Sequence, residues 1–293
     1  MRTYRVADVQ ELRMKKHPRL EGHYLMSPFV WLESGRPRMA LRVVEPKPDG
    51  SWGLSKIFFA EGDGLEFEIM DVPAFVPGPW PEDSGGSEDP TVFFHDGECC
   101  VYYTGWNSDI RQGKLLCAAG PDISALEKRG AVLHGTQHWN TKEATVAEAP
   151  DRWWLFYEYS EIEHSLIGRA WSNGYGEEWH LENDLFGLRE DHWDSWHLST
   201  GPMALRETDR PVMFYNGADS SARWRIGWIE FDAGYTKVIR RADEPLVAPQ
   251  HLPSGFPDIA FAASTVEVDA QKLELYFSVG DRKLCKATIV IGE

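Results

Sequence analysis

The 293-residue sequence lacks any apolar run of about 18 residues, the length that a helix needs to cross a bilayer. Its first 16 residues mix charges throughout and lack the apolar stretch followed by small residues that marks a secretory signal. These absences argue against a helical membrane protein and predict a cytoplasmic location. With 42% hydrophobic and 13% aromatic residues, the chain can still bury a large core.

Positive charge is also scarce, because 46 acidic residues outnumber 30 Lys and Arg and give a formal net charge of −16. Nucleic acids and acidic membranes select basic surfaces, so we expect neither as a partner. Thirteen tryptophans in so acidic a chain indicate a sugar, since carboxylates bind hydroxyls and indole faces pack on pyranose rings. The expected partner is therefore an oligosaccharide or glycoside; the sequence makes no prediction of oligomeric state.

Signatures of other chemistries are missing as well. The chain has no GxSxG elbow, HExxH helix, P-loop or GxGxxG turn. Its four cysteines include the vicinal pair Cys99 and Cys100 but no CxxC spacing, and His192 and His197 lack zinc spacing. We therefore expect no metal and no cofactor.

Helical periodicity is nearly absent, and what the chain offers instead is a repeat. Five segments each contain a strand, a polar turn and a second strand rich in aromatic and branched residues: 28–45, 89–107, 142–160, 201–219 and 258–281. They begin roughly every 55–60 residues, the size of a four-stranded propeller blade. The prediction is an all-β fold, one five-bladed β-propeller domain over residues 1–293, with a β-sandwich as the alternative. The segment before about His17 should complete the last blade from outside.

Blades of a propeller meet at a central axis, so function should gather at matching positions of the repeat. One position of the second strand is occupied in turn by Arg42, Thr104, Glu158, Asn216 and Ser278. The openings of the repeats add Glu88, Asp89, Lys142, Glu143, Asp194, His197 and Asp258. Glycosidases need two carboxylates in different environments, one protonated and one ionised, and several repeats supply candidates.

The same residues resemble a known family, the mannoside phosphorylases and β-mannosidases of glycoside hydrolase family 130, which are five-bladed propellers. Residues 86–90 (Gly-Ser-Glu-Asp-Pro) resemble its Gly-x-Glu-Asp-Pro-Arg motif, and residues 141–144 resemble its Lys-Asn/Asp-Ala stretch. Residues 193–202 resemble its Trp-Glu…Gly-x-Gly-Pro stretch, 214–217 stand where it has Tyr-His-Gly, and 279–281 resemble its closing Gly-Ala-Ala-Asp. The resemblance covers nearly the whole chain.

Three departures fall on groups with which the family's phosphorylases hold phosphate. Thr91 replaces the Arg of Glu-Asp-Pro-Arg, Glu158 stands at the Arg of a His-Arg pair, and Asn216 replaces the His of Tyr-His-Gly. Phosphate recognition depends on forked cationic donors, so a carboxylate there adds repulsion. This pattern favours an inverting glycoside hydrolase acting on β-mannosides or mannose-containing oligosaccharides, with water in place of phosphate. The alternatives are a mannoside phosphorylase and a non-catalytic carbohydrate-binding propeller.

The resemblance implies roles for individual residues. Asp89 would be the catalytic acid, passing its proton through a sugar hydroxyl, and Glu158 would be the base that activates water. The residues expected to bind substrate are Arg42, Lys142, Glu143, Asp194, His197, Asn216 and Asp281. Trp106, Trp139 or Trp196 would form a stacking wall.

Overall fold

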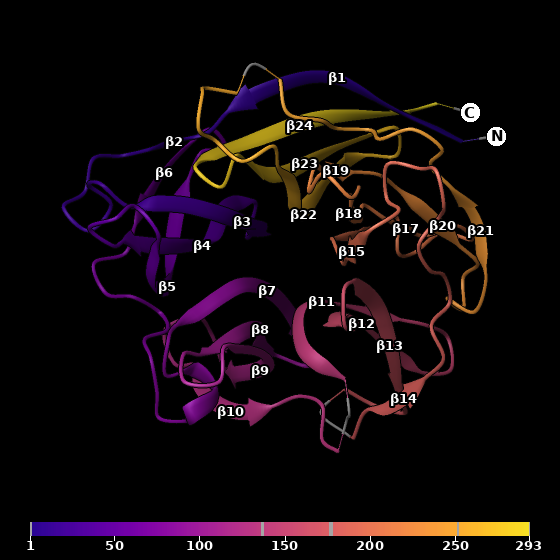
Figure 1. Ribbon diagram of the computed structural model, residues 1–293. Helices are drawn as coiled ribbons and strands as arrows, with labels where there is room; N and C mark the ends of the chain where they lie inside the picture. The colour runs from indigo at the N-terminus through magenta and orange to yellow at the C-terminus, as the bar shows by residue number, and fades with distance from the viewer. Residues whose placement is uncertain (1, 136–137, 176–177, 251, 293) are drawn as a thin grey trace.

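A computed structural model describes residues 2–135, 138–175, 178–250 and 252–292 of the chain. Apart from the short 3₁₀ turn η1 (Pro81–Asp83), the elements of this part of the chain are β-strands. The strands form sheets set around a central axis, as Figure 1 shows, and the fold resembles a β-propeller. None of the described helical segments is long or apolar enough to cross a membrane.

The first two sheets follow the predicted repeats closely, because each hairpin alternates aromatic or branched residues with tight polar turns. The first sheet contains β3 (Tyr24–Glu33), β4 (Arg36–Pro46), β5 (Trp52–Gly62) and β6 (Glu66–Ile69), with β2 (Arg13–Met14) at its edge. The second contains β7 (Ser87–His95), β8 (Glu98–Asn107), β9 (Gln112–Gly120) and β10 (Glu127–Ala131). Between them lies a shared core that includes Phe59 and Tyr103.

The last sheet joins the two ends of the chain. It contains β22 (Ala260–Asp269), β23 (Lys272–Val279) and β24 (Lys283–Gly292), and its outer strand is β1 (Thr3–Glu11). Strand β1 runs antiparallel to β24, with Thr3 opposite Gly292, and the two termini lie near each other in Figure 1. The prediction that the N-terminal segment completes the last sheet from outside is confirmed, and this pairing closes the ring of sheets.

The remaining repeats are less regular. Strands β11 (Trp139–Glu148), β12 (Trp153–Ser160), β13 (Ser165–Ser172) and β14 (His180–Glu182) form the third repeat. In the fourth repeat the strands are broken midway into the inner pieces β15 (His197–Ser199), β18 (Asn216–Ala218) and β19 (Trp224–Ile226) and the outer pieces β16 (Met203–Ala204), β17 (Val212–Met213), β20 (Ile229–Phe231) and β21 (Val238–Arg241). The inner pieces join the third sheet through one parallel pair, Ser165 with His197, to give seven strands.

The break in the fourth repeat explains why the prediction of five regular blades is not confirmed. Glycines lie at or beside the break, and the ring of Trp193 packs directly over two of them. A Cβ at Gly217 would meet that ring at 2.8 Å, and a Cβ at Gly227 would meet it at 2.5 Å. Glycine inside a strand permits such close approach but weakens the ladder. The all-β, propeller-like arrangement is observed; the count of five blades is not.

Three innermost strands carry matching irregularities beside the axis. The pairing register shifts within β3 after Met26, within β7 after Glu88 and within β11 after Lys142. At the shifts the backbone is left-handed, with φ of 51° at Ser27, 46° at Asp89 and 23° at Glu143. A bulge of this kind re-aims a side chain, and it turns all three residues toward the axis. Because non-glycine residues rarely adopt positive φ, the strain marks this ring of positions as a candidate site.

Candidate active site

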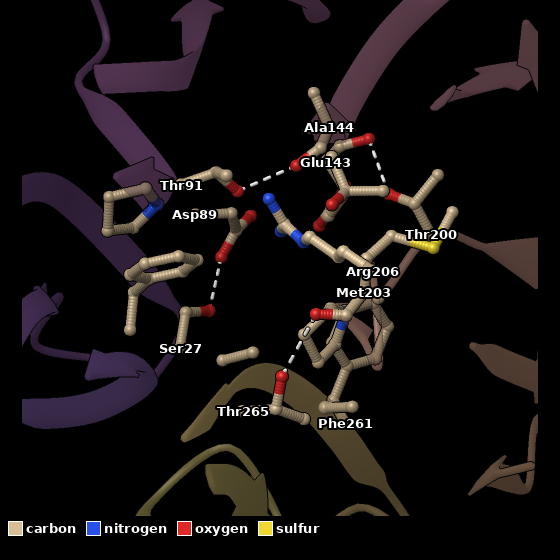
Figure 2. Close-up of a pocket in the computed structure, with 17 residues that line it drawn as sticks. Ser27, Asp89, Thr91, Glu143, Ala144, Thr200, Met203, Arg206, Phe261 and Thr265 are labelled. Atoms are coloured by element: carbon tan, nitrogen blue, oxygen red, sulfur yellow. Dashed lines mark hydrogen bonds between the residues drawn. The ribbon is translucent and has the colours of Figure 1, made fainter. Parts of the chain in front are cut away.

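Two cavities lie on the axis and share a wall. The front axial cavity, of about 160 Å³, is lined by Arg42, Trp52, Glu88, Lys142, Trp224 and Asp281 among others. The rear axial cavity, of about 60 Å³, includes Thr91, Thr200 and Arg206 in its lining and is drawn in Figure 2. Ser27, Asp89 and Glu143 line both cavities, so the three bulge residues separate one from the other.

Asp89 is held by a clamp of donors. The Nη1 atom of Arg42 lies 3.0 Å from each carboxylate oxygen of Asp89, and the hydroxyl of Ser27 donates to the same carboxylate. Burial alone would raise the pKa of Asp89, but the Arg42 guanidinium and the hydrogen bonds from Ser27 and Glu143 hold it below its ordinary value. Asp89 is therefore ionised in the free site.

Glu143 has the opposite protonation preference. Its side chain hydrogen-bonds Asp89, and burial together with the negative charges of Asp89 and Glu158 raises the pKa of Glu143 well above its ordinary value. Two carboxyl groups in contact cannot both ionise at low cost, so they share one proton. The structure places that proton on Glu143.

Arg42 organises the other side of the front cavity. Besides Asp89, its guanidinium contacts Glu88 at 2.6 Å and Ser55 Oγ at 3.1 Å, and it lies 5.2 Å from the ring centre of Trp52. The Arg42 side chain is only 6% exposed, so these contacts replace the water it lost. Burial lowers the pKa of Arg42, whereas the carboxylates of Asp89 and Glu88 raise it. The net effect is a raised pKa, so Arg42 stays charged.

Lys142 and Glu158 lie opposite each other on β11 and β12, and their charged groups are 3.7 Å apart. The negative charge of Glu158 raises the pKa of Lys142 against the effect of burial. Glu158 is 7% exposed and does not line either axial cavity, whereas Lys142 lines the front one. The residue in contact with Asp89 is thus Glu143, and the predicted pairing of Asp89 with Glu158 stays a prediction.

Asp281 reaches the front cavity from the turn after β23. Burial raises the pKa of Asp281 to about 6, with Arg42 opposing and Asp89 adding to the rise. The structure therefore brings four predicted substrate-binding residues together with Asp89 at the axis: Arg42, Lys142, Glu143 and Asp281.

The other three predicted binding residues lie elsewhere. Asp194 is fully buried, accepts bonds from Arg189 at 3.0 Å and Arg241 at 2.5 Å, and lines neither axial cavity. Asn216 is also fully buried and joins two strands, donating to Thr200 O and accepting from the N–H of Ala262. Both side chains therefore stabilise the structure behind the site and do not line its cavities.

His197 lies beside the axis but outside both cavities. Its Nδ1 accepts from the N–H of Ser165 at 2.8 Å, and its ring stacks on Trp224 with the centroids 5.7 Å apart. Burial lowers the pKa of His197, so the ring is neutral near pH 7. A neutral ring adds no positive charge to the site.

Sequence reasoning did not assign Ser27, Trp52 or Arg206 to the site, and it named Glu88 only as a repeat opening. Ser27 had a detectable signal, because Ser27-Pro28 matches Asp89-Pro90 at the same point of the repeat. Trp52, the first residue of β5, and Arg206, in the turn after β16, carry no such pattern, since their direction depends on the fold. Among the described residues, no cluster of three or more His, Cys, Asp or Glu could hold a metal ion.

The comparisons with known proteins cover nearly the whole chain. No family model matches it. A 1,2-β-oligomannan phosphorylase of Thermoanaerobacter sp. (strain X514) is 21% identical, over 94% of this chain and 93% of that protein. A shorter match, 25% identical over 37% of this chain and 32% of the relative, is to a β-1,2-mannobiose phosphorylase of Listeria innocua.

Solved structures share the fold. The Listeria innocua β-1,2-mannobiose phosphorylase in complex with β-1,2-mannobiose superposes with a TM-score of 0.79 at 18% identity, covering 94% of this chain and 92% of its own. A second solved structure is described as part of the GH130 family of mannoside phosphorylases, a family said to contain glycoside hydrolases that target β-1,2 mannosidic linkages in Candida mannan. It superposes with a TM-score of 0.77 at 23% identity, covering 91% of this chain and 84% of its own. Matches in sequence and in fold thus confirm the resemblance of this chain to the mannoside phosphorylases of glycoside hydrolase family 130.

Proposed function

We propose that this chain is an enzyme that cleaves a β-mannosidic bond, β-1,2-linked as in the substrates that name its relatives, in the front axial cavity. The observation that carries the proposal is the clamped Asp89 of the Glu-Asp-Pro motif, which lies at the axis with a carboxyl partner in contact. The cleaved bond joins the anomeric carbon to the leaving oxygen. That oxygen must gain a proton as the bond breaks.

The proton comes from the Asp89 and Glu143 pair in this proposal. Glu143 holds it in the free site, and Asp89 is ionised under Arg42. When a sugar hydroxyl enters beside Asp89, the proton of Glu143 passes to Asp89 and onward through that hydroxyl to the leaving oxygen. A carboxylic acid kept neutral by its surroundings is the form that a general acid requires.

The relatives support phosphate as the second reactant. Both curated relatives are phosphorylases, and this favours the phosphorylase alternative over the hydrolase prediction. In that reaction a phosphate oxygen bonds to the anomeric carbon and mannose 1-phosphate is released with the shortened acceptor.

A second candidate, hydrolysis, is supported by the charges in the site. The two cations that line the front cavity, Arg42 and Lys142, are already compensated by Glu88, Asp89 and Glu158. An incoming phosphate would meet these carboxylates without a free forked donor among the lining residues described. In this case Glu158 takes the proton of a water whose oxygen attacks the anomeric carbon, as the sequence predicts.

Product analysis distinguishes the two candidates. The purified protein is incubated with β-1,2-mannobiose in buffer with and without 10-fold excess inorganic phosphate, and the products are separated by anion-exchange chromatography. Phosphate-dependent turnover with mannose 1-phosphate supports the phosphorylase, and free mannose at an unchanged rate without phosphate supports the hydrolase. Asp89→Asn is the control and should abolish either product; an Asp89→Asn protein of parental activity contradicts the proposal altogether.

We also propose the finer points of architecture that the fold leaves open. The broken strands β15 to β21 act as a fourth blade, which would give five blades in one catalytic domain. The backbone bonds from Phe214 to Pro202 and from Gly227 to Tyr215 bridge the break and support this assignment. An experimental structure with continuous pairing across the break would test it.

A further inference from the structure

A second large cavity, which we call the tryptophan cleft, lies beside the front axial cavity. It has a volume of about 650 Å³ and is lined by Trp106, Arg111, Trp139, Asn140, Ser160, Glu161, Ile162, Glu163, His164 and His197. The lining comes from the ends of β8, β11 and β12 and from the turn between β12 and β13. The proposed reaction uses none of the polar groups in it.

The tryptophan cleft adjoins the front axial cavity at two places, although the two linings share no residue. His197 lines the cleft, and the face of its ring stacks at an interplanar angle of 1° on Trp224, which lines the front axial cavity. Along β11, Trp139 and Asn140 line the cleft, whereas Lys142 and Glu143, a few residues further on, line the axial cavity. The cleft is therefore the neighbour of the axial cavity on this side.

The cleft exposes two large apolar side chains to water, which is energetically unfavourable. Trp139 is 54% exposed and Ile162 is 101% exposed, and both large side chains lie in the lining. Of the thirteen tryptophans in the chain, only Trp52 and Trp139 are exposed, and both line cavities: Trp52 the axial one and Trp139 the cleft. Exposed indole rings that lie in cavities indicate ligand-binding surfaces rather than incompletely buried core residues.

The polar side chains of the cleft differ in how they are held. The side chain of Asn140 accepts from the N–H of Gly113 at 2.7 Å and donates to Ser160 Oγ at 3.0 Å, so it is fixed in one orientation. By contrast, the side chains of Arg111, Glu161 and Glu163 make no ion pair or hydrogen bond within the part of the chain that the structure describes. Aromatic faces beside free polar groups of both signs suit a neutral polyol better than an ion.

The axial cavity is too small for a whole oligosaccharide. Its volume of about 160 Å³ is well below the roughly 300–1,000 Å³ typical of ligand pockets. It encloses little more than one sugar ring, so the rest of a longer chain must lie outside it. The cleft, with four times the volume and indole faces for the apolar side of a pyranose, is the adjoining space that can receive it.

We propose that the tryptophan cleft is an oligosaccharide subsite, which binds sugar units beyond the cleaved linkage by stacking on Trp139. The substrate class is then a β-mannooligosaccharide of three or more units in preference to a disaccharide. This inference rests on the proposed function for the identity of the sugar, but the cleft and its aromatic faces do not depend on the acceptor being phosphate or water.

The test compares two substrates in one pair of variants. The values of kcat/KM are measured for β-1,2-mannobiose and β-1,2-mannotetraose with the parent, Trp139→Ala and Trp139→Phe. We expect Trp139→Ala to lower kcat/KM at least tenfold for the tetraose and less than twofold for the biose, whereas Trp139→Phe keeps most of the tetraose activity because it keeps a ring. Phe94→Ala, at an aromatic residue that is 51% exposed outside this cleft, is the matched control and should change neither value.

Equal losses on both substrates, or no loss on the tetraose, would overturn the subsite. Failure of the proposed function is recognised separately, because the parent would then cleave neither substrate. In that case binding of mannotetraose is measured by titration calorimetry. A dissociation constant at least tenfold weaker in Trp139→Ala than in the parent still supports the subsite, and an unchanged constant or no binding by the parent refutes it.

Discussion

The proton placed on Glu143 leads to the sharpest prediction, which concerns the variant Glu143→Gln. The amide keeps the volume of the side chain and can still donate a hydrogen bond to Asp89, but it has no proton to transfer. If Glu143 supplies the proton to the leaving oxygen, Glu143→Gln should lower kcat at least about a hundredfold, the lower range for loss of general acid catalysis. KM should change little, because the shape and the Arg42 clamp remain.

The pH dependence of stability tests the same claim without turnover. The pKa of Glu143 is higher in the folded protein than in the unfolded chain. Its contribution to stability is therefore fully present at pH values below the pKa of the unfolded chain, and it is lost as the pH rises through the raised pKa of the folded protein. Each unit of rise corresponds to about 1.4 kcal/mol of folding free energy. Glu143→Gln removes this dependence, so the variant should gain stability relative to the parent between pH 5 and pH 9.

Urea denaturation at pH 5, 7 and 9 measures this difference. The matched control is Glu148→Gln, an exposed carboxylate at the far end of β11, for which the difference from the parent should not depend on pH. A pH-independent difference for Glu143→Gln would mean that Glu143 is already ionised at pH 5. The proton would then have to be sought on Asp281, and the reasoning from the carboxyl pair would be wrong.

Two further variants test the surroundings of the site. Asp194→Asn leaves Arg189 and Arg241 facing a neutral side chain in a fully buried position, so it should destabilise the fold by about 3–5 kcal/mol. The loss should be seen as a lower Tm, while the protein that stays folded keeps its kcat. An unchanged Tm would contradict the structural role of Asp194. Asp281→Asn should reduce the loss of stability that the parent shows as pH rises from 4 through about 6, because the raised pKa of Asp281 makes its protonated form the favoured one in the folded state. Parallel stability curves for parent and variant over this range would show that Asp281 is not buried as described.

The sequence by itself determined the features that depend on neighbours along the chain. Alternating apolar residues and polar turns predicted the hairpins of β3–β4, β7–β8, β11–β12 and β22–β23, and the run around Asp89 identified the motif and the family resemblance. Strand pairing across a short turn is local, so its signal survives in the sequence.

Only the tertiary structure decided what meets at the axis. Asp194 and Asn216 lie in the right order along the chain, yet their side chains turn into the wall, because their contacts with Arg241 and Ala262 are set by strands that are distant in sequence. The fourth repeat broke where the Trp193 ring packs over glycines, which no hairpin pattern records. Glu143 became the partner of Asp89 because bulges with positive φ aimed both side chains from neighbouring sheets at one point. Such a meeting depends on the relative tilt of whole sheets, a long-range quantity that hydrophobic periodicity and motif spacing do not encode.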